Sequence, residues 1–401
     1  MLLAPWVLIP WRKQMKKQTL RIFLVCYAAY LFIYVARLNL SIAAPDLKAI
    51  GVLNTEQIGL LGGIFSVVYA CGRLLSGILS DRHAPWKMIS IGLVLCGLSN
   101  IGFGLFPPFY AILLLWGINA IAQSMLWGSI LRILSLIYPE DVAKKRAAYM
   151  ATTSAAGNLV AILLNTELIN RFGIAWAFLV PGSITVTISL LVVLYTRHIH
   201  SPVQERTSQS YSAFLRKPSA RKMLIPSMVH GVLKDNISLW IVVYIMDTFG
   251  VNLEQSSYYI LLIPTVGFLA KLLAPELYRL TGDKDRPLLI WGFVASAAGS
   301  VLLAICTHSA WFAVVCLSFV FMAISIINTC LLSFFPLRFA KEGYVASVSG
   351  ILDFASYLGT GISSIAFGIM IERFGYGAMF ATWAVLCGLA IVLVRKQEKP
   401  E

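Results

Sequence analysis

Long apolar segments alternate with short polar connections along almost the whole chain. Each segment reaches or exceeds the roughly 20 residues that an α-helix needs to cross a bilayer. Twelve such segments are present, at about 20–44, 57–80, 86–106, 109–137, 146–169, 174–196, 222–248, 254–280, 287–306, 310–335, 343–371 and 375–395. The pattern predicts an all-α membrane protein with twelve transmembrane helices.

One polar stretch is longer than the other connections and divides the segments into six and six. We therefore expect a cytoplasmic N-terminal segment, an N-terminal six-helix bundle, a cytoplasmic linker, a C-terminal six-helix bundle and a cytoplasmic tail, at 1–21, 22–196, 197–221, 222–395 and 396–401. The apolar start of the chain, Met1–Pro10, is too short for a cleavable signal peptide, and none is expected.

Composition supports this prediction. Hydrophobic residues make up 59% of the 401 residues and charged residues only 12%, whereas soluble domains carry roughly 25% charged residues. Too few polar groups are present to cover a water-soluble surface, so composition excludes a soluble enzyme, a secreted disulfide scaffold and a disordered chain. The seven cysteines lie in apolar stretches without a C-x-x-C pair, and we interpret them as small buried hydrophobic residues.

The net charge of +14 follows from the distribution of lysine and arginine. Of 32 basic residues, 24 fall in the N-terminal segment, the linker, the tail and the loops on the same side of the membrane, and only Lys48, Arg171 and Arg373 fall on the other. Basic residues concentrate on the cytoplasmic side, so both termini are predicted in the cytoplasm and the location is the cell membrane. The charge needs no nucleic-acid partner, and the expected partners are the lipid bilayer and a small anion.

The two halves of the chain form an internal repeat. A shift of about 197 residues places Arg37 on Lys234, Arg73 beside Lys271 and Arg82 on Arg279. Charges inside membrane spans rarely coincide by chance. Two parallel six-helix repeats are typical of the major facilitator fold, which binds its substrate between the halves near the middle of the membrane.

The second span ends in a loop motif. Gly77, Asp81 and Arg82 have the glycine-x-x-x-aspartate-basic spacing of the major facilitator cytoplasmic loop, in which an ion pair across helix ends favours one conformational state. The second copy is degraded, because Ala274 and Tyr278 stand at the glycine and aspartate positions. Two solvated loop charges are the alternative interpretation.

Five basic residues lie inside spans, where charge is costly and marks substrate pathways. Arg37 shares a helix face with Tyr30 and Tyr34, and its planar fork suits phosphate or carboxylate; snorkelling to the interface is the alternative. His230 and Lys234 share a face of span seven, where Lys234 is expected to bind an anion or to pair internally. The remaining three either line the pathway or have structural roles, with a structural role favoured for the last: Arg73, Lys271 and Arg132.

Two acids also lie deep in spans. Asp235 follows Lys234 and points about 100° away from it on an ideal helix, and Asp353 lies inside span eleven. A carboxylate at membrane depth is a candidate proton carrier or a fixed partner of a lysine. The sequence contains no phosphate-binding glycine loop and no catalytic or zinc-binding histidine spacing, so we expect neither an enzyme nor a metal or cofactor.

These motifs resemble the organophosphate:phosphate antiporter family, the group of the glycerol-3-phosphate and hexose-phosphate transporters. The matching residues are Tyr27 to Tyr30, Arg37, Asn39 and Pro45 in span one, Tyr69, Arg73, Gly77 and Ser80 to Arg82 in span two, Gln123, Trp127 and Arg132 in span four, and, from span eleven on, Ser349 and Gly350, Tyr357 to Gly359, and Phe374 and Gly375. The resemblance implies that Arg37 and Lys234 hold a phosphate, that a phosphorylated metabolite exchanges for phosphate, and that the two halves rock to give alternating access. A monomer is the expected state.

The chain departs from that family at three positions. Lys234 replaces the usual arginine, Gly157 stands where the phosphate-ester transporters carry a histidine, and Asp353 replaces a small residue. Proton-coupled symport of a non-phosphorylated organic anion is therefore the main alternative. Export of a drug and a transporter-like sensor of a ligand also remain open.

Overall fold

The computed structural model describes residues 5–199, 221–250, 253–305 and 309–395. Nearly all of these residues are helical, and they divide by packing into two compact units. Unit 1 comprises residues 1–143 and 156–203, and unit 2 comprises 144–155 and 204–401. Most of the linker expected at 197–221 and the whole tail at 396–401 lie outside the described residues.

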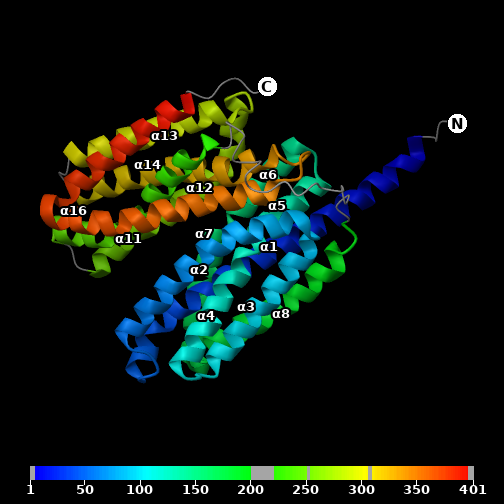
Figure 1. The fold of residues 1–401 in the computed structure, drawn as a ribbon, viewed down its shortest axis with the longest axis horizontal. Helices are drawn as coiled ribbons and strands as arrows, with labels where there is room; N and C mark the ends of the chain where they lie inside the picture. The colour runs from blue at the N-terminus through cyan, green and yellow to red at the C-terminus, as the bar shows by residue number, and fades with distance from the viewer. Residues whose placement is uncertain (1–4, 200–220, 251–252, 306–308, 396–401) are drawn as a thin grey trace. The chain divides into compact units, whose positions relative to one another are not determined.

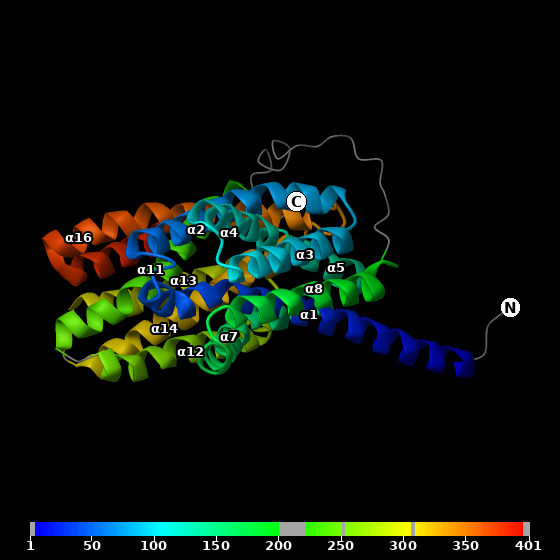
Figure 2. The same ribbon diagram turned by 90° about the horizontal axis from the view of Figure 1, so that it is seen from below.

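Unit 1 is a bundle of helices that lie alongside one another (Figures 1 and 2). It contains α1 (Pro5–Ala49), α2 (Thr55–Arg82), α3 (Pro85–Gly104), α4 (Phe109–Ser124), α5 (Leu126–Ile137), most of α7 (Thr153–Phe172) and α8 (Trp176–Thr196). Local sequence accounts for several helix ends. Asn54 and Gln57 form a reciprocal capping box at the start of α2, and Pro85 occupies the first turn of α3.

Unit 2 is a second helical bundle, again seen in Figures 1 and 2. It contains most of α6 (Glu140–Ala151), together with α11 (Leu224–Phe249), α12 (Leu253–Leu280), α13 (Asp285–Ile305), α14 (Ala310–Thr329), a π-helical turn η1 (Cys330–Phe334), α15 (Phe335–Leu337) and α16 (Val345–Arg395). The long α16 covers the last two predicted spans. It kinks at Gly375, whose φ of 76° is strained for any residue with a Cβ atom.

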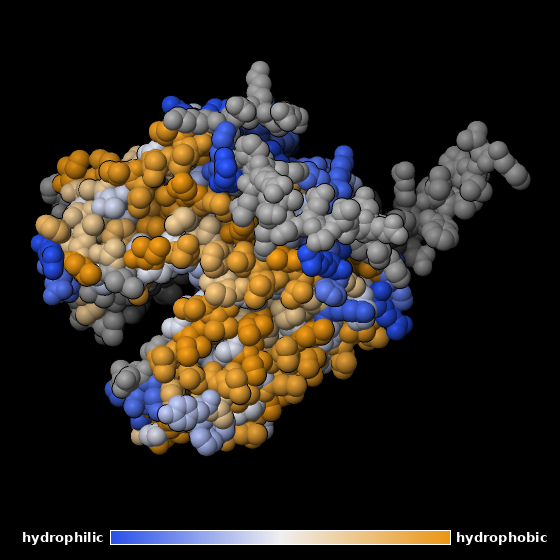
Figure 3. All heavy atoms as spheres, viewed as in Figure 1, coloured by the Kyte–Doolittle hydropathy of each residue, from blue (hydrophilic) through white to orange (hydrophobic). Residues whose placement is uncertain are grey.

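By length and composition, ten of the described helical stretches are apolar enough to cross a membrane. The other two predicted spans are the helices α11 and α12. Large apolar side chains such as Leu114, Leu190 and Trp291 are more than 60% exposed. In Figure 3 hydrophobic residues cover the sides of the helices and hydrophilic residues gather near helix ends, the distribution expected of a surface that faces lipid.

A buried polar network holds part of the core of unit 1 together. Asn39 on α1 donates a hydrogen bond to the Asn100 side chain on α3, at 2.7 Å, and to the Ala177 carbonyl on α8, at 3.0 Å. Asn100 in turn donates to the Cys96 carbonyl. Both asparagines have no solvent exposure. Aromatic rings surround this network, with Phe103 and Phe178 stacked at 4.2 Å between centroids.

In unit 2, α11 and α16 cross very closely at Gly231. A Cβ atom built on Gly231 would lie 2.1 Å from the carbonyl oxygen of Ser356, so no larger residue fits without movement of a helix. Small residues permit this kind of backbone approach between membrane helices. The crossing places Tyr357 and Thr360 of α16 beside the middle of α11, where Lys234 and Asp235 lie.

Candidate functional site

In unit 1 the candidate substrate ligand Arg37 lies in a cluster of rings and amides. Its Nε donates a hydrogen bond to Gln123 Oε1 on α4 at 2.8 Å. The guanidinium carbon lies 4.5 Å, 4.9 Å and 5.4 Å from the ring centroids of Tyr69, Phe65 and Tyr34. Cation–π contacts of this kind contribute about 0.5–2 kcal/mol each, more when they are dry. The cluster holds a half-buried guanidinium in one orientation.

The sequence placed Arg37, Tyr30 and Tyr34 on one helix face, and the structure brings Tyr34 to the cation. The ring of Tyr30 packs instead against Tyr34 and Trp127, at 5.5 Å and 4.9 Å between centroids, and the residue is only 7% exposed. Tyr30 therefore stabilises the position of the Tyr34 ring.

In unit 2 the candidate ligand Lys234 lies beside a carboxylate. Its Nζ is 3.1 Å from Asp235 Oδ1, and the two side chains are 27% and 28% exposed. The ammonium also lies 5.6 Å from the centroid of the Tyr357 ring. The expectation that Asp235 points away from Lys234 is wrong, because the long lysine stem turns back and reaches its neighbour. The internal pair that the sequence left open is the arrangement observed.

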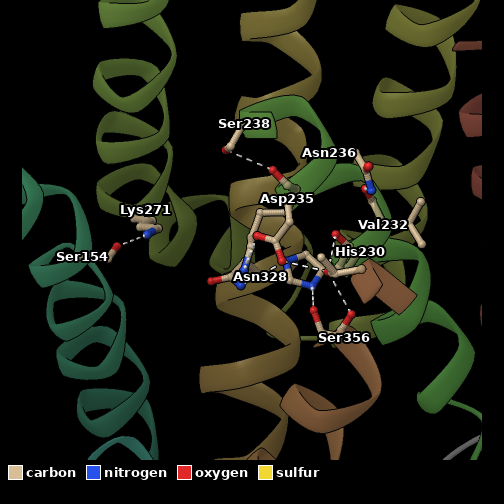
Figure 4. Close-up of polar contacts among 12 residues, drawn as sticks. Ser154, His230, Val232, Asp235, Asn236, Ser238, Lys271, Asn328 and Ser356 are labelled. Atoms are coloured by element: carbon tan, nitrogen blue, oxygen red, sulfur yellow. Dashed lines mark hydrogen bonds and ion pairs between the residues drawn. The ribbon is translucent and has the colours of Figure 1, made fainter. Parts of the chain in front are cut away.

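His230 lies one helical turn from Lys234 but is completely buried. Figure 4 shows Asn328 of α14 and Ser356 of α16 approaching its ring, at 3.0 Å from Nε2 and 3.2 Å from Nδ1. Both ring nitrogens therefore have partners from other helices. The histidine joins α11 to α14 and α16, and we assign it to positioning Lys234 rather than to direct contact with a substrate.

Arg73 and Lys271 are related by the repeat, and each donates hydrogen bonds to backbone carbonyls at a helix break in its own unit. Arg73 is 2% exposed and its Nη1 donates to the Ser124 carbonyl, where the helix breaks between α4 and α5. Lys271 donates to the Ala151 carbonyl at 3.2 Å and to Ser154 Oγ at 2.6 Å, where the helix breaks between α6 and α7 (Figure 4).

A break in a helix leaves backbone carbonyls without intrahelical partners, and a cation is a favourable donor to such a helix end. Threonines favour the second break, because the hydroxyls of Thr152 and Thr153 bond to the carbonyls of Tyr149 and Met150. This local structural role competes with the substrate contact that the sequence proposed for Arg73 and Lys271.

The motif of Gly77, Asp81 and Arg82 forms the C-terminal end of α2, beside another basic residue. Asp81 is 5% exposed at the end of α2. Arg132 on α5 donates hydrogen bonds through Nη1 to the Ser80 and His83 carbonyls at the same helix end. These contacts give Arg132 the structural role that the sequence favoured. The structure places Gly77 and Arg82 on α2 as the motif requires.

In the second repeat a different network replaces the degraded motif. The Tyr278 hydroxyl lies 3.3 Å from both Lys144 Nζ on α6 and Arg338 Nη2, and Arg338 Nε lies 2.7 Å from Asp285 Oδ2. Asp285 begins α13 and is 2% exposed. Burial lowers the pKa of Arg338, but Asp285 and Tyr278 raise this pKa by more, so the net pKa is raised and the guanidinium is a permanent cation.

Several residues of these clusters could not be predicted from the sequence. Phe65, Thr360 and Asp285 carried no signal of their own, because their roles come from contacts with distant helices. The deep acid Asp353 is 7% exposed on α16, one turn before Tyr357, within electrostatic range of Lys234.

The fold and these clusters define a class of protein: a polytopic membrane protein with two helical units, each presenting a cationic side chain at a repeat-related position. The sequence profile described as Major Facilitator Superfamily matches residues 26–364 of this chain. The chain therefore belongs to the major facilitator superfamily, which confirms the predicted fold class.

Curated relatives agree with the resemblance to the organophosphate:phosphate antiporter group. The "Probable hexose phosphate transport protein" of Chlamydia trachomatis is 29% identical over 182 residues, which are 45% of this chain and 40% of that protein. The chain thus matches less than half the length of this relative. The "Membrane sensor protein UhpC" of Salmonella typhimurium is 22% identical over 93% of this chain and 90% of its own length. The "Probable sulfoacetate transporter SauU" of Cupriavidus necator is 24% identical over 90% and 89%.

Among solved structures, the Escherichia coli fucose:proton symporter FucP superposes with a TM-score of 0.77 at 16% identity, covering 94% of this chain and 98% of FucP. This similarity supports the fold alone. The family and these neighbours are transporters and a sensor rather than enzymes, in agreement with the prediction from sequence.

Proposed function

We propose that this chain is a secondary active transporter of a small organic anion, a phosphorylated metabolite exchanged for inorganic phosphate by alternating access. The observation that carries the proposal is the arrangement at Arg37. A neutral amide, Gln123, holds Nε at 2.8 Å, so the orientation of the fork is set without a carboxylate at that atom. The planar guanidinium of an arginine matches a phosphate or carboxylate and can bind it in a bidentate manner.

Two further facts support an anionic substrate. Lys234 occupies the repeat-related position in unit 2, so each repeat supplies one cation to the proposed transport cycle. The chlamydial relative is named for hexose phosphate. We propose that Arg37 and Lys234 are the anion-binding residues of their respective units.

Reconstituted vesicles loaded with phosphate provide the test. We expect uptake of labelled glycerol phosphate or hexose phosphate that requires internal phosphate and that is abolished in Arg37→Ala. Arg171→Ala is the matched control, because Arg171 is an exposed arginine of unit 1 whose side chain is 70% exposed and pairs with Glu167. Uptake by Arg37→Ala at the level of Arg171→Ala would contradict the proposal.

A binding measurement separates transport from sensing. A ligand at a hundredfold excess over its Kd stabilises the folded protein by about 2.7 kcal/mol and raises its melting temperature. Because one relative of nearly full length is named as a sensor, stabilisation by a phosphate ester without any flux would identify a ligand sensor.

A second candidate is proton-coupled transport of a non-phosphorylated organic anion. It is favoured by the relative named for sulfoacetate and by the carboxylate that occupies Lys234. Stabilisation and uptake with sulfonates or carboxylates, but not with phosphate esters, would select it over exchange.

The placement in the membrane is also a proposal. We propose a monomer in the cell membrane with both termini in the cytoplasm and six spans in each of the bundles 22–196 and 222–395. Residues 144–155 pack with unit 2 although they belong to the first of these bundles by sequence. Protease protection of terminal tags in sealed vesicles tests the orientation.

A further inference from the structure

In unit 2 the proposed anion-binding residue, Lys234, already contacts a carboxylate of the protein itself. Asp235 Oδ1 lies 3.1 Å from Lys234 Nζ, so the carboxylate is in direct contact with the ammonium and neutralises its charge. Both side chains retain more than a quarter of their exposure, so the pair can open. A substrate anion at Lys234 therefore competes with Asp235, and a state with both anions on one lysine suffers repulsion between like charges.

The charged groups around the pair are two carboxylates and one further lysine, among the residues that the structure describes. Asp353 on α16 adds a second negative charge within electrostatic range of Lys234, and Tyr357 and the buried His230 are the other titratable groups nearby. Lys271 on α12 is within electrostatic range of Lys234, but its ammonium already bonds to Ser154 and the Ala151 carbonyl. An arriving anion is accommodated if one carboxylate becomes neutral.

Thr360 gives Asp235 a partner in either protonation state. Its hydroxyl lies 2.8 Å from Asp235 Oδ2, 3.0 Å from the Gly231 carbonyl and 3.1 Å from the Ser356 carbonyl. One hydroxyl hydrogen faces three acceptors, so the hydroxyl donates to an ionised Asp235 or turns to a backbone carbonyl. In the second orientation the threonine oxygen accepts the proton of a neutral carboxyl group.

We propose that Asp235 is the proton-exchanging counter-ion of Lys234, with Thr360 as the residue that positions it. An incoming anion displaces the Asp235 carboxylate from Lys234. The carboxylate then takes up one proton from the water on the side of the membrane from which the anion entered. The bound state then contains the anion on Lys234, a neutral Asp235 and a Thr360 hydroxyl turned to the backbone. The inference rests on the proposed function to the extent that an anion must bind Lys234.

Asp235, rather than Asp353, is assigned this role on two observations. Asp235 bonds directly to the lysine that the anion must reach, and its side chain is 28% exposed. Asp353 is 7% exposed, and its effect on Lys234 is electrostatic rather than a direct bond. Asp353→Asn is therefore the comparison variant for Asp235→Asn.

The first experiment measures phosphate self-exchange in reconstituted vesicles at equal internal and external pH, from acidic to alkaline. Dividing each variant rate by the wild-type rate at the same pH removes the ionisation of phosphate itself. We expect the ratio for Asp235→Asn to rise by up to about tenfold per pH unit on the alkaline side, because the asparagine needs no proton. The ratio for Asp353→Asn should stay constant. A constant ratio for Asp235→Asn would overturn the proposal.

A second pair of variants keeps the carboxylate in place. Thr360→Val removes the donor to Asp235 and should move the alkaline limb of the profile up by about one pH unit, because a hydrogen bond to a charged group is lost. Thr360→Ser should restore the wild-type profile. Ser364→Ala is the control, since Ser364 lies one turn further along α16 and bonds to the Thr360 carbonyl. An unchanged profile in Thr360→Val would refute the role of the hydroxyl.

The two proposals fail in different ways. If Arg37→Ala exchanges phosphate at the level of the control, the proposed role of Arg37 fails, while the pH profiles of the other variants can still be compared. If the Asp235 and Thr360 variants have the same pH profile as the wild-type protein and Arg37→Ala is inactive, only the proposal that Asp235 exchanges a proton fails.

Discussion

Gln123→Glu tests the Arg37 cluster with one isosteric change. In the wild-type protein a neutral amide oxygen lies 2.8 Å from Arg37 Nε, and the amide nitrogen donates to Asn119 Oδ1 at 3.0 Å. Gln123 has no solvent exposure. The glutamate keeps the shape and the acceptor at Arg37, but it adds a full negative charge beside the proposed anion ligand.

The size of the effect follows from the geometry. An anion on the terminal nitrogens of Arg37 would lie about 7 Å from the new carboxylate, where two unit charges repel by about 2.4 kcal/mol at an effective dielectric constant of about 20. Because about 1.4 kcal/mol is a tenfold change in affinity, phosphate binding should weaken by about 50-fold. Protonation of the glutamate removes the charge, so the loss should diminish at low pH.

Thermal-shift titration with phosphate and phosphate self-exchange measure this loss. Gln57→Glu is the charge-matched control, because Gln57 lies in the capping box at the start of α2, where glutamate is equally suitable. The glutamate at position 123 cannot donate to Asn119, so a lower melting temperature without ligand is expected and is recorded separately. An affinity for phosphate equal to that of Gln57→Glu would refute the assignment of Arg37 as an anion ligand.

Two further predictions concern unit 2. Gly231→Ala should lower stability by about 3 kcal/mol, because its Cβ would lie 2.1 Å from a backbone oxygen of α16; Gly361→Ala, with open space at the same test, should leave the melting temperature unchanged or higher. Arg338→Ala should lower stability by about 1–3 kcal/mol, because the buried Asp285 loses its ion-pair partner. Adding Asp285→Asn should recover part of that loss, and a double variant no more stable than Arg338→Ala alone would show that the pair is not the cause.

The helical segments and the repeat were predictable because the hydropathy of a span and the position of a charge within it depend only on the local sequence. The positions of Arg37 and Lys234 on α1 and α11 follow from helix register alone. The break between α6 and α7 is less visible, since the apolar pattern continues across Thr152 and only hydroxyl bonds to the backbone mark it.

The partners of these charges were not predictable from register. Gln123 and Tyr69 reach Arg37 from other helices, and only a resemblance between families pointed to them. Thr360 meets Asp235 because Gly231 lets α16 approach α11, a contact between residues 125 positions apart in the sequence. Lysine length, rather than helix angle, decided that Lys234 pairs with its own neighbour.

The packing of α6 has a consequence for how the chain is made. Lys144 of α6 and the Tyr278 hydroxyl that it contacts are 134 residues apart. At about 5–20 residues per second, the ribosome adds α12 about 7–27 s after α6. Until α12 is made, α6 lacks this neighbour, and it still lacks it after α7 and α8 have completed the first repeat. Expression of the first repeat alone should therefore leave α6 accessible to labelling reagents that the full chain excludes.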